Sequence, residues 1–345
     1  MKDRSLPMKK LIKTVLAGLL LCLLLLAGSI SVHAQIQFDR ASVNVLNGSS
    51  RKVRISCKGK YSVATTDDSI ATVTHSGKVK GKKAGSCEIV VTCGAETARL
   101  PVHVLRSLRD GSILFLGHRG YQGKYPENTI SSFEGALNYG ADGVELDVHI
   151  TNSKDLLVFH DGSLSRVSGK QGKIRNLTEQ TRKKYRVKGG GKSDQIPTLE
   201  EALRYLKSRN ATVFIHLKNG KKFTGSNADL VARCIRECGM EKQCVVFNSN
   251  CDSIWYFTAH HPDIPTGFFY GGSSPSQARG RMRKAASRGA SWFFFYSKRP
   301  VSFSMIQYAH QCGLRAGLYQ TRKKSDILQL LDYGADFTIM YRRLI

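Results

Sequence analysis

Eight short apolar runs recur after residue 112, and the stretches between them are amphipathic with helical spacing. This alternation predicts βα units, whose parallel strands are buried on both faces and therefore lack a polar side. Eight such strands can close into a (β/α)8 barrel. Thr198 and Glu201 form a capping box that predicts the start of one of the helices. The predicted strands are 112–116, 143–148, 212–217, 244–247, 265–269, 292–296, 314–318 and 335–339.

A ninth apolar run at 156–159 follows the second strand too closely for a parallel crossover, which needs a dozen or more residues. We therefore predict an extra antiparallel hairpin strand that turns between Ser153 and Lys154, with Asp147 opposite His160. Glu145 and Asp147 are two residues apart and so point to the same side of their strand. This spacing gathers two carboxylates and an imidazole at one strand end, where barrel enzymes carry their catalytic residues.

Residues 36–106 have a different pattern, in which short β-branched runs alternate with Asn-Gly, Lys-Gly, Ser-Gly and Ala-Gly turns. The pattern predicts a small all-β sandwich. The stretches 67–73, 77–81 and 84–89 resemble the bacterial immunoglobulin-like (Ig-like) group 2 family. That resemblance implies a spacer or an adhesive module, and we favour a spacer because no acid or histidine cluster is found there. The predicted strands are 41–46, 52–57, 70–74, 87–92 and 98–104.

The first 34 residues have the pattern of a secretory signal peptide. Basic residues precede an apolar stretch at 15–27, and Val32-His33-Ala34 is a small-residue cleavage site. The apolar stretch is shorter than the ~20 residues that a membrane-spanning helix needs. We therefore predict cleavage after Ala34 and a secreted, periplasmic or cell-envelope location, followed by the Ig-like part at 36–106 and the barrel at 110–345.

The cysteines do not divide evenly between the two predicted domains. Cys57, Cys87 and Cys93 fall in the first domain, and five cysteines fall in the second. The sequence therefore predicts either one free thiol in each domain or a disulfide between the domains. Cys234 and Cys238 lie one helical turn apart, but no second close pair has the spacing of a zinc site. We expect these two to be small apolar residues on a buried helix face.

The formal net charge of +27 restricts the partners of the chain. A nucleic-acid partner is not expected, because no helix-turn-helix, zinc-finger or aromatic RNA-binding motif is present and export would remove the protein from the chromosome. A cationic exported protein can meet an anionic envelope polymer or membrane surface. A basic face that is merely solvated is the alternative.

Six short motifs follow one another after residue 116: Gly117-His118-Arg119-Gly120, Pro126-Glu127-Asn128-Thr129, the segment 140–148, His160-Asp161, Leu164-Ser165-Arg166 and the segment 196–201. They resemble, in family order, the successive motifs of the glycerophosphodiester phosphodiesterase family. The resemblance is close from Gly117 to about Leu206 and looser beyond. It implies a TIM-type barrel that hydrolyses a small glycerophosphodiester to sn-glycerol 3-phosphate and an alcohol with the help of a metal ion.

The resemblance also implies roles for individual residues. His118 and His160 match the acid and base pair that handles protons at the attacking and leaving oxygens. Arg119 matches a residue that grips the phosphate, which a guanidinium can do bidentately. Lys218 matches a second position near the phosphate, and Glu127 matches one near the metal or the glycerol.

The predicted metal ligands include one departure from the family. Glu145 and Asp147 offer hard oxygen ligands that suit Ca²⁺ or Mg²⁺, and buried carboxylates require a cation. Where the family usually has a metal-ligating Glu, this chain has His216, and an imidazole also admits Mn²⁺, Co²⁺ or Zn²⁺. We therefore predict one divalent ion bound by these three residues. The alternative is that His216 only hydrogen-bonds a neighbour, and that Glu145, Asp147 and water, with or without Glu127, hold the ion. Tyr319-Gln320 in place of Trp-Thr, and the absence of Asp-x-Pro after 334–339, are further departures.

Two alternative functions remain open at this point. A phospholipase-like enzyme of the same barrel superfamily would act on whole lipids and would need an exposed apolar rim. A non-catalytic envelope adhesin would use the Ig-like domain and the basic charge, with His216 marking a weakened site. The intact set of predicted catalytic residues argues against the adhesin.

Overall fold

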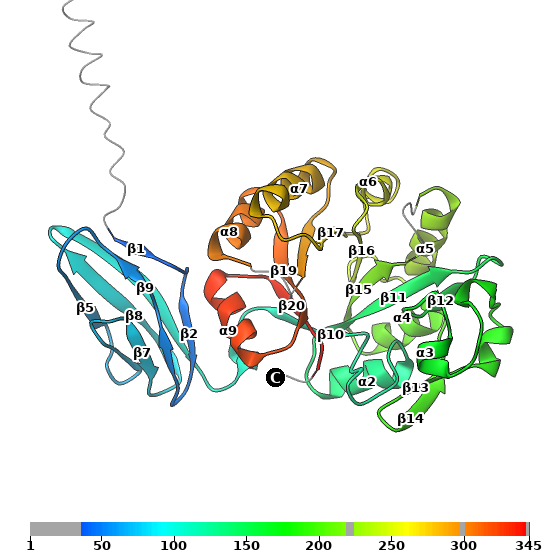
Figure 1. The fold of residues 1–345 in the computed structure, drawn as a ribbon, viewed down its shortest axis with the longest axis horizontal. Coiled ribbons are helices and arrows are strands. Elements are labelled where there is room, and N and C mark those ends of the chain that lie inside the picture. Colours follow the sequence, from blue (N-terminus) through cyan, green and yellow to red (C-terminus); the bar gives the residue numbers. More distant parts are fainter. Residues whose placement is uncertain (1–35, 219–223, 297–300, 343–344) are drawn as a thin grey trace, which may run out of the picture.

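The computed structural model describes residues 36–218, 224–296, 301–342 and 345, which form an all-β N-terminal part and an α/β barrel (Figure 1). The predicted signal segment lies outside the described residues. Within these ranges, no helix combines the length and apolar character needed to cross a membrane.

Eight parallel strands form the barrel, as the alternation of apolar runs predicted. β10 pairs with both β11 and β20, which closes the sheet. The aromatic side chains of Phe214, Phe247, Phe294 and Phe337 fill the barrel interior and contact one another in edge-to-face, tilted and stacked pairs. The strands are β10 (Leu114–His118), β11 (Gly143–Ile150), β15 (Thr212–Leu217), β16 (Cys244–Asn248), β17 (Thr266–Tyr270), β18 (Trp292–Tyr296), β19 (Arg315–Thr321) and β20 (Phe337–Met340).

The helices that surround the barrel bury one face each against the strands. The capping box predicted from Thr198 and Glu201 is present and begins α4. The loop region before α4 also holds the short helix α3 (Ser165–Ser168), two 3₁₀ turns and the hairpin of β13 (Arg186–Gly189) with β14 (Lys192–Gln195). The longer helices are α2 (Ile130–Asn138), α4 (Leu199–Ser208), α5 (Ser226–Glu237), α6 (Cys251–His260), α7 (Pro275–Ser287), α8 (Phe303–Gln311) and α9 (Lys324–Tyr333).

The predicted hairpin exists, but its predicted register was wrong by one residue. β12 (Leu156–Val158) pairs antiparallel with β11 so that Val158 lies opposite Val148. Asp147 therefore lies opposite Phe159, whose N–H donates to the Asp147 carbonyl, rather than opposite His160. The cause is a loop with an odd number of residues, in which Lys154 adopts a left-handed conformation with φ of 69°. His160 instead follows the strand as the first residue of the next turn region.

The N-terminal part consists of strands alone, which form a four-stranded sheet, a three-stranded sheet and a two-stranded pair. Val45, Val79, Ile89 and Val102 from the two larger sheets meet in one apolar core, as in a sandwich. The resemblance to the Ig-like family stays a prediction. The strands are β1 (Gln37–Phe38), β2 (Val43–Leu46), β3 (Ser50–Lys52), β4 (Ile55–Ser56), β5 (Tyr61–Thr65), β6 (Ala71–Val73), β7 (Lys78–Gly81), β8 (Gly85–Cys93) and β9 (Glu96–Leu105).

A buried ion cluster joins the N-terminal part to the barrel. The fully buried carboxylate of Asp332 in α9 accepts from Arg40 at 2.6 Å, lies 2.9 Å from Arg51, and accepts from the Asn44 N–H at 2.6 Å. Asp332 is near the C-terminal end of α9, which precedes the N-terminal end of β20. The N-terminal part therefore contacts the end of the barrel opposite to the carboxyl ends of the strands.

The cysteine pairing follows neither predicted alternative completely. Cys57 and Cys93 form a disulfide within the N-terminal part, and Cys87 stays free and buried. All five cysteines of the barrel are free thiols. Cys234 and Cys238 are buried in the apolar core between α5 and the sheet, as we expected for small apolar residues.

Candidate active site

The carboxyl ends of three neighbouring strands bring the predicted catalytic and metal-binding residues together. His118 ends β10 and lies beside Glu145 of β11 in the parallel register. Asp147, two residues further along β11, lies beside His216 of β15. His118, Glu145 and Asp147 are fully buried. The alternation of side chains along each strand thus points these groups to the same side of the sheet.

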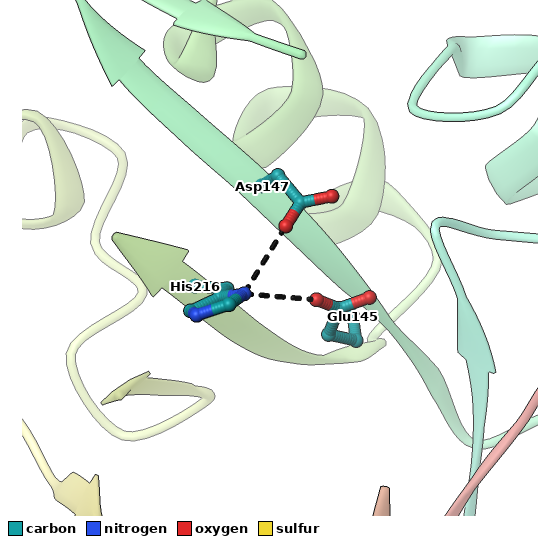
Figure 2. A group of neighbouring side chains, drawn as sticks. All are labelled: Glu145, Asp147 and His216. Carbon is teal, nitrogen blue, oxygen red and sulfur yellow. Dashed lines mark hydrogen bonds and ion pairs between the residues drawn. The ribbon is translucent and has the colours of Figure 1, made fainter. Parts of the chain in front are cut away.

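Glu145, Asp147 and His216 form a three-residue cluster whose ligand atoms all lie within 4.8 Å of one another. Figure 2 shows the imidazole of His216 facing both carboxylates, with its Nδ1 3.2 Å from Asp147 Oδ1 and 3.9 Å from Glu145 Oε1. The His216 ring stacks on Phe247 with centroids 4.6 Å apart, which fixes its orientation. The three residues predicted as metal ligands therefore converge on one point.

The electrostatics of this cluster suit a divalent cation. Burial, together with the neighbouring charge of Asp147, raises the pKa of Glu145 to about 8. Burial also acts to raise the pKa of Asp147, but the hydrogen bond from His216 and the charges of Lys218 and Arg119 hold it well below its usual range. Burial lowers the pKa of His216, which favours the neutral imidazole that metals bind. Two buried carboxylates beside a neutral imidazole are a donor set that fits one such ion.

His118 lies in a hydrogen-bond network between the cluster and the barrel wall. Its Nε2 is 2.9 Å from the Tyr319 hydroxyl, which donates to Glu145 Oε1 at 3.1 Å. The amide of Gln122 contacts its Nδ1, and the amide of Gln320 lies 3.1 Å from Nε2. Burial, with the nearby charge of Arg119, lowers the pKa of His118 well below its usual value. His118 is therefore a neutral imidazole that can accept a proton.

His160 occupies a more open position after β12, where its side chain is 28% exposed. Its Nδ1 is 2.6 Å from Asp161 Oδ1, and Asp161 is also bound by Arg166. Burial lowers the pKa of His160, while the charge of Asp147 and the hydrogen bond to Asp161 oppose the shift. The Asp161 contact leaves Nε2 as the nitrogen available to a substrate.

The three other predicted site residues lie around the cluster. The backbone N–H of Arg119 donates to Glu145 Oε2. The side-chain Nε of Arg119 lies 3.2 Å from Asp147 Oδ2, but it is buried and has no well-aligned acceptor in the described structure. Lys218 Nζ is 3.6 Å from Asp147 Oδ1. Glu127 lies outside the three-residue cluster, because its carboxylate is bound by the guanidinium groups of Arg119 and Arg166.

Sequence reasoning missed several side chains that hold this site in place. Asn128 donates to Asp147 Oδ2 at 2.9 Å and accepts the Asp147 N–H, and its backbone is left-handed with φ of 58°. Gln122 and Gln320 contact His118, and Gln320 is also left-handed. Tyr319, which the sequence marks only as a departure from the family pattern, bridges His118 and Glu145. An Asn in a motif is a usable signal because Asn adopts the left-handed region more readily than most residues, whereas nothing in the sequence singles out Gln122.

The fold and the site together define a (β/α)8-barrel protein with a candidate divalent-metal centre, two flanking histidines and two cationic side chains, a set suited to phosphoester chemistry. Residues 118–340 match the model of the Glycerophosphoryl diester phosphodiesterase family. The chain belongs to that family.

Similar proteins cover the barrel rather than the whole chain. A glycerophosphodiester phosphodiesterase of Caldanaerobacter subterraneus is 27% identical over 231 residues, which are 65% of this chain and 91% of that protein. An uncharacterized Bacillus subtilis protein, YqiK, is 30% identical over 64% of this chain and 90% of its own length. An Oleispira antarctica phosphodiesterase, solved in complex with the product sn-glycerol-3-phosphate, has a TM-score of 0.59 at 20% identity and covers 68% of this chain and 95% of its own.

Proposed function

We propose that this protein hydrolyses small glycerophosphodiesters to sn-glycerol 3-phosphate and an alcohol. One observation carries the proposal. His118, Arg119 and Lys218 surround the cluster of Glu145, Asp147 and His216, and the chain belongs to this family of phosphodiesterases. The product-bound Oleispira antarctica phosphodiesterase, which has the same fold, supports this substrate class.

The two histidines differ in a way that supports separate roles. Burial lowers the pKa of both histidines, and His118 is fully buried beside Glu145 whereas the His160 side chain is 28% exposed; we assign the neutral His118 as the proton acceptor at the attacking oxygen. His160 keeps the contact with Asp161 that stabilises an imidazolium, so it donates a proton to the leaving alcohol oxygen. In the net reaction the bond between phosphorus and the alcohol oxygen breaks, the alcohol leaves with a proton, and the oxygen of one consumed water molecule takes its place on phosphorus.

The cationic groups bind and orient the phosphate. Arg119 has a buried Nε without a well-aligned acceptor, which leaves this N–H free to bind a phosphoryl oxygen. Lys218 adds a second positive charge beside Asp147. A divalent ion held by Glu145, Asp147 and His216 would supply positive charge to the phosphoryl oxygens. Ca²⁺ or Mg²⁺ suits the two carboxylates, and Mn²⁺, Co²⁺ or Zn²⁺ is compatible with His216.

The direct test is hydrolysis of glycerophosphocholine by the purified protein with and without a chelator. We expect release of choline and sn-glycerol 3-phosphate, a loss of at least ~10²-fold in rate after chelation, and recovery when a divalent metal is added back. Full activity in chelator would refute the metal site. Activity on intact phospholipid vesicles, but none on the soluble diester, would identify the phospholipase-like alternative instead.

We also propose that the protein is exported by its N-terminal segment and meets an anionic surface of the cell envelope. Residues 35–345, which remain after the predicted cleavage, contain 48 Lys or Arg and 25 Asp or Glu, and this net charge of +23 supports the partner. We expect it to bind vesicles that contain phosphatidylglycerol, and we expect this binding to weaken steeply as salt shortens the Debye length from ~30 Å at 0.01 M to ~8 Å at 0.15 M. Cosedimentation over a salt series measures this, and salt-independent binding would exclude an electrostatic partner.

A further inference from the structure

One side of the barrel carries positive charge without any negative charge in its sequence. The 62 residues from 264 to 325 contain eleven Lys or Arg and no Asp or Glu. This segment includes β17, α7, β18, α8 and β19. A protein surface normally intersperses both signs, so an acid-free segment of this length needs an explanation.

Five exposed cations lie on helix α7 and at the residue that directly follows it: Arg279, Arg281, Arg283, Lys284 and Arg288. Arg279 lies 5.1 Å over the Tyr308 ring of α8, and Arg283 donates to the Tyr308 hydroxyl at 2.8 Å. On the opposite flank of α7, the Arg288 guanidinium lies 5.5 Å from the Trp255 ring of α6. The charges therefore spread across α7 from one neighbouring helix to the other.

These five cations have no carboxylate partner among the residues that the structure describes. Elsewhere on the barrel surface, exposed arginines do pair, such as Arg204 with Glu200 at 2.8 Å and Arg236 with Asp263 at 2.6 Å. Between the α7 side chains, Gly280 leaves open space within 4 Å of where a Cβ would lie. The described residues therefore supply no counter-charge to this group of cations.

An exposed aromatic side chain adjoins the same group. Trp255 is 45% exposed, and it is the one large apolar side chain that is exposed in the described structure. Its ring packs beside Arg288 rather than in the core. Tryptophan beside Arg and Lys is the combination that partitions into the headgroup region of a bilayer, where the indole has an apolar body and a polar N–H.

We propose that the α7 face, defined as Arg279, Arg281, Arg283, Lys284, Arg288 and Trp255, docks on the surface of an anionic lipid bilayer. This proposal assigns a surface to the envelope binding proposed above and rests on that binding. It does not depend on the proposed hydrolytic activity. Charge complementarity selects an anionic partner. The exposed Trp255 selects a bilayer over a soluble polyanion, because a bilayer offers an apolar layer beneath its charged surface.

The α7 face is separate from the candidate active site and from the contact with the N-terminal part. Figure 1 shows α7 between α6 and α8 at the outer side of the barrel, while the N-terminal part lies against α9. None of the six residues contacts His118, Glu145, Asp147 or His216 in the described structure. Docking through this face therefore uses no residue of the candidate site and none of the contacts of α9 with the N-terminal part.

The test compares two triple variants that remove the same number of charges. Arg281→Gln, Lys284→Gln and Arg288→Gln alter the α7 face, whereas Lys183→Gln, Lys184→Gln and Lys188→Gln alter the exposed basic cluster after α3. The two triple variants and a third, separate variant, Trp255→Ala, are compared with the parent chain by cosedimentation with phosphatidylglycerol vesicles. Vesicles of phosphatidylcholine alone measure any binding by the apolar stretch at 15–27.

We expect the α7 triple variant to bind about 10- to 100-fold more weakly, and the control variant to lose less than about threefold. Trp255→Ala should weaken vesicle binding on the order of tenfold while leaving heparin binding unchanged. Acrylamide quenching reports the insertion of Trp255, since the only other tryptophan, Trp292, is buried. All three variants should hydrolyse soluble glycerophosphocholine like the parent.

Three outcomes would overturn the proposal. Equal losses in the two triple variants would mean that net charge alone drives binding. Undiminished vesicle binding by Trp255→Ala, with heparin bound equally well, would identify a soluble polyanion as the partner. No binding by the parent chain would remove both this face and the envelope contact, and the hydrolysis assay would still decide the enzymatic proposal separately.

Discussion

Replacement of His118 or His160 by alanine is expected to lower kcat for glycerophosphocholine by at least ~10²-fold. Each histidine handles one proton in the proposed mechanism, and the side chains that hydrogen-bond His118, which are Tyr319, Gln122 and Gln320, include no imidazole to take over from it. The double variant should be little slower than either single variant, because residues that act as a unit are not additive.

The two variants need different structural controls. His118 is fully buried and packs against Tyr319 and Tyr341, so His118→Ala leaves a cavity that lowers the free energy of unfolding. His118→Asn keeps most of the volume and hydrogen bonding, and thermal unfolding measures any remaining loss. His310→Ala, on α8 and paired with Asp336, is the matched control that should retain full activity. Near-parental kcat in folded His118→Asn or His160→Ala would disprove the acid and base assignment.

The barrel could be predicted from the sequence because its strands are buried on both faces. Each strand is therefore a short apolar run, as in Trp292–Tyr296, and eight runs specify closure. The strands of the N-terminal part were harder to predict from the sequence. β7 (Lys78–Gly81) has one apolar residue between two lysines, and the run at 52–57 divides between β3 and β4, which pair in different sheets. Pairing depends on partners that a single strand does not reveal.

The hairpin register failed for a local reason. The prediction assumed a loop with an even number of residues between the two strands. The loop instead has an odd number of residues, and Lys154 within it adopts a left-handed backbone. Lysine carries no signal for that conformation, unlike Gly or Asn. The shift moves His160 out of the ladder, where its side chain is held by Asp161 rather than set opposite Asp147.

The site could be predicted where residues lie on one strand and was incomplete where they come from distant loops. Glu145 and Asp147 follow from the two-residue period of β11. Tyr319 reaches the same carboxylate from β19, 174 residues away in sequence. Its contact with His118 depends on closure of the barrel, so no local pattern could indicate it.

The second large effect is expected at His216, where His216→Glu should raise the affinity for Ca²⁺ and Mg²⁺ by roughly 10- to 100-fold and reduce the preference for Mn²⁺, Co²⁺ or Zn²⁺. The substitution adds a hard oxygen and one negative charge to a cluster whose ligand atoms lie within 4.8 Å of one another. Metal-dependent shifts in Tm measure affinity without reference to activity. His216→Gln is the matched control, because it removes the imidazole without adding charge.

A purely structural role for His216 gives a different result. In the described geometry Nδ1 faces Asp147 Oδ1 at 3.2 Å, which is also the contact of a simple N–H donor. The same nitrogen cannot donate that proton and bind a metal, so metal binding requires the tautomer with the proton on Nε2. If His216 only orients Asp147, His216→Gln should keep the metal preference and affinity of the parent, and His216→Glu should not change the order of metals. Such a result would leave Glu145 and Asp147 as the protein ligands, with water completing the coordination of a Ca²⁺ or Mg²⁺ ion.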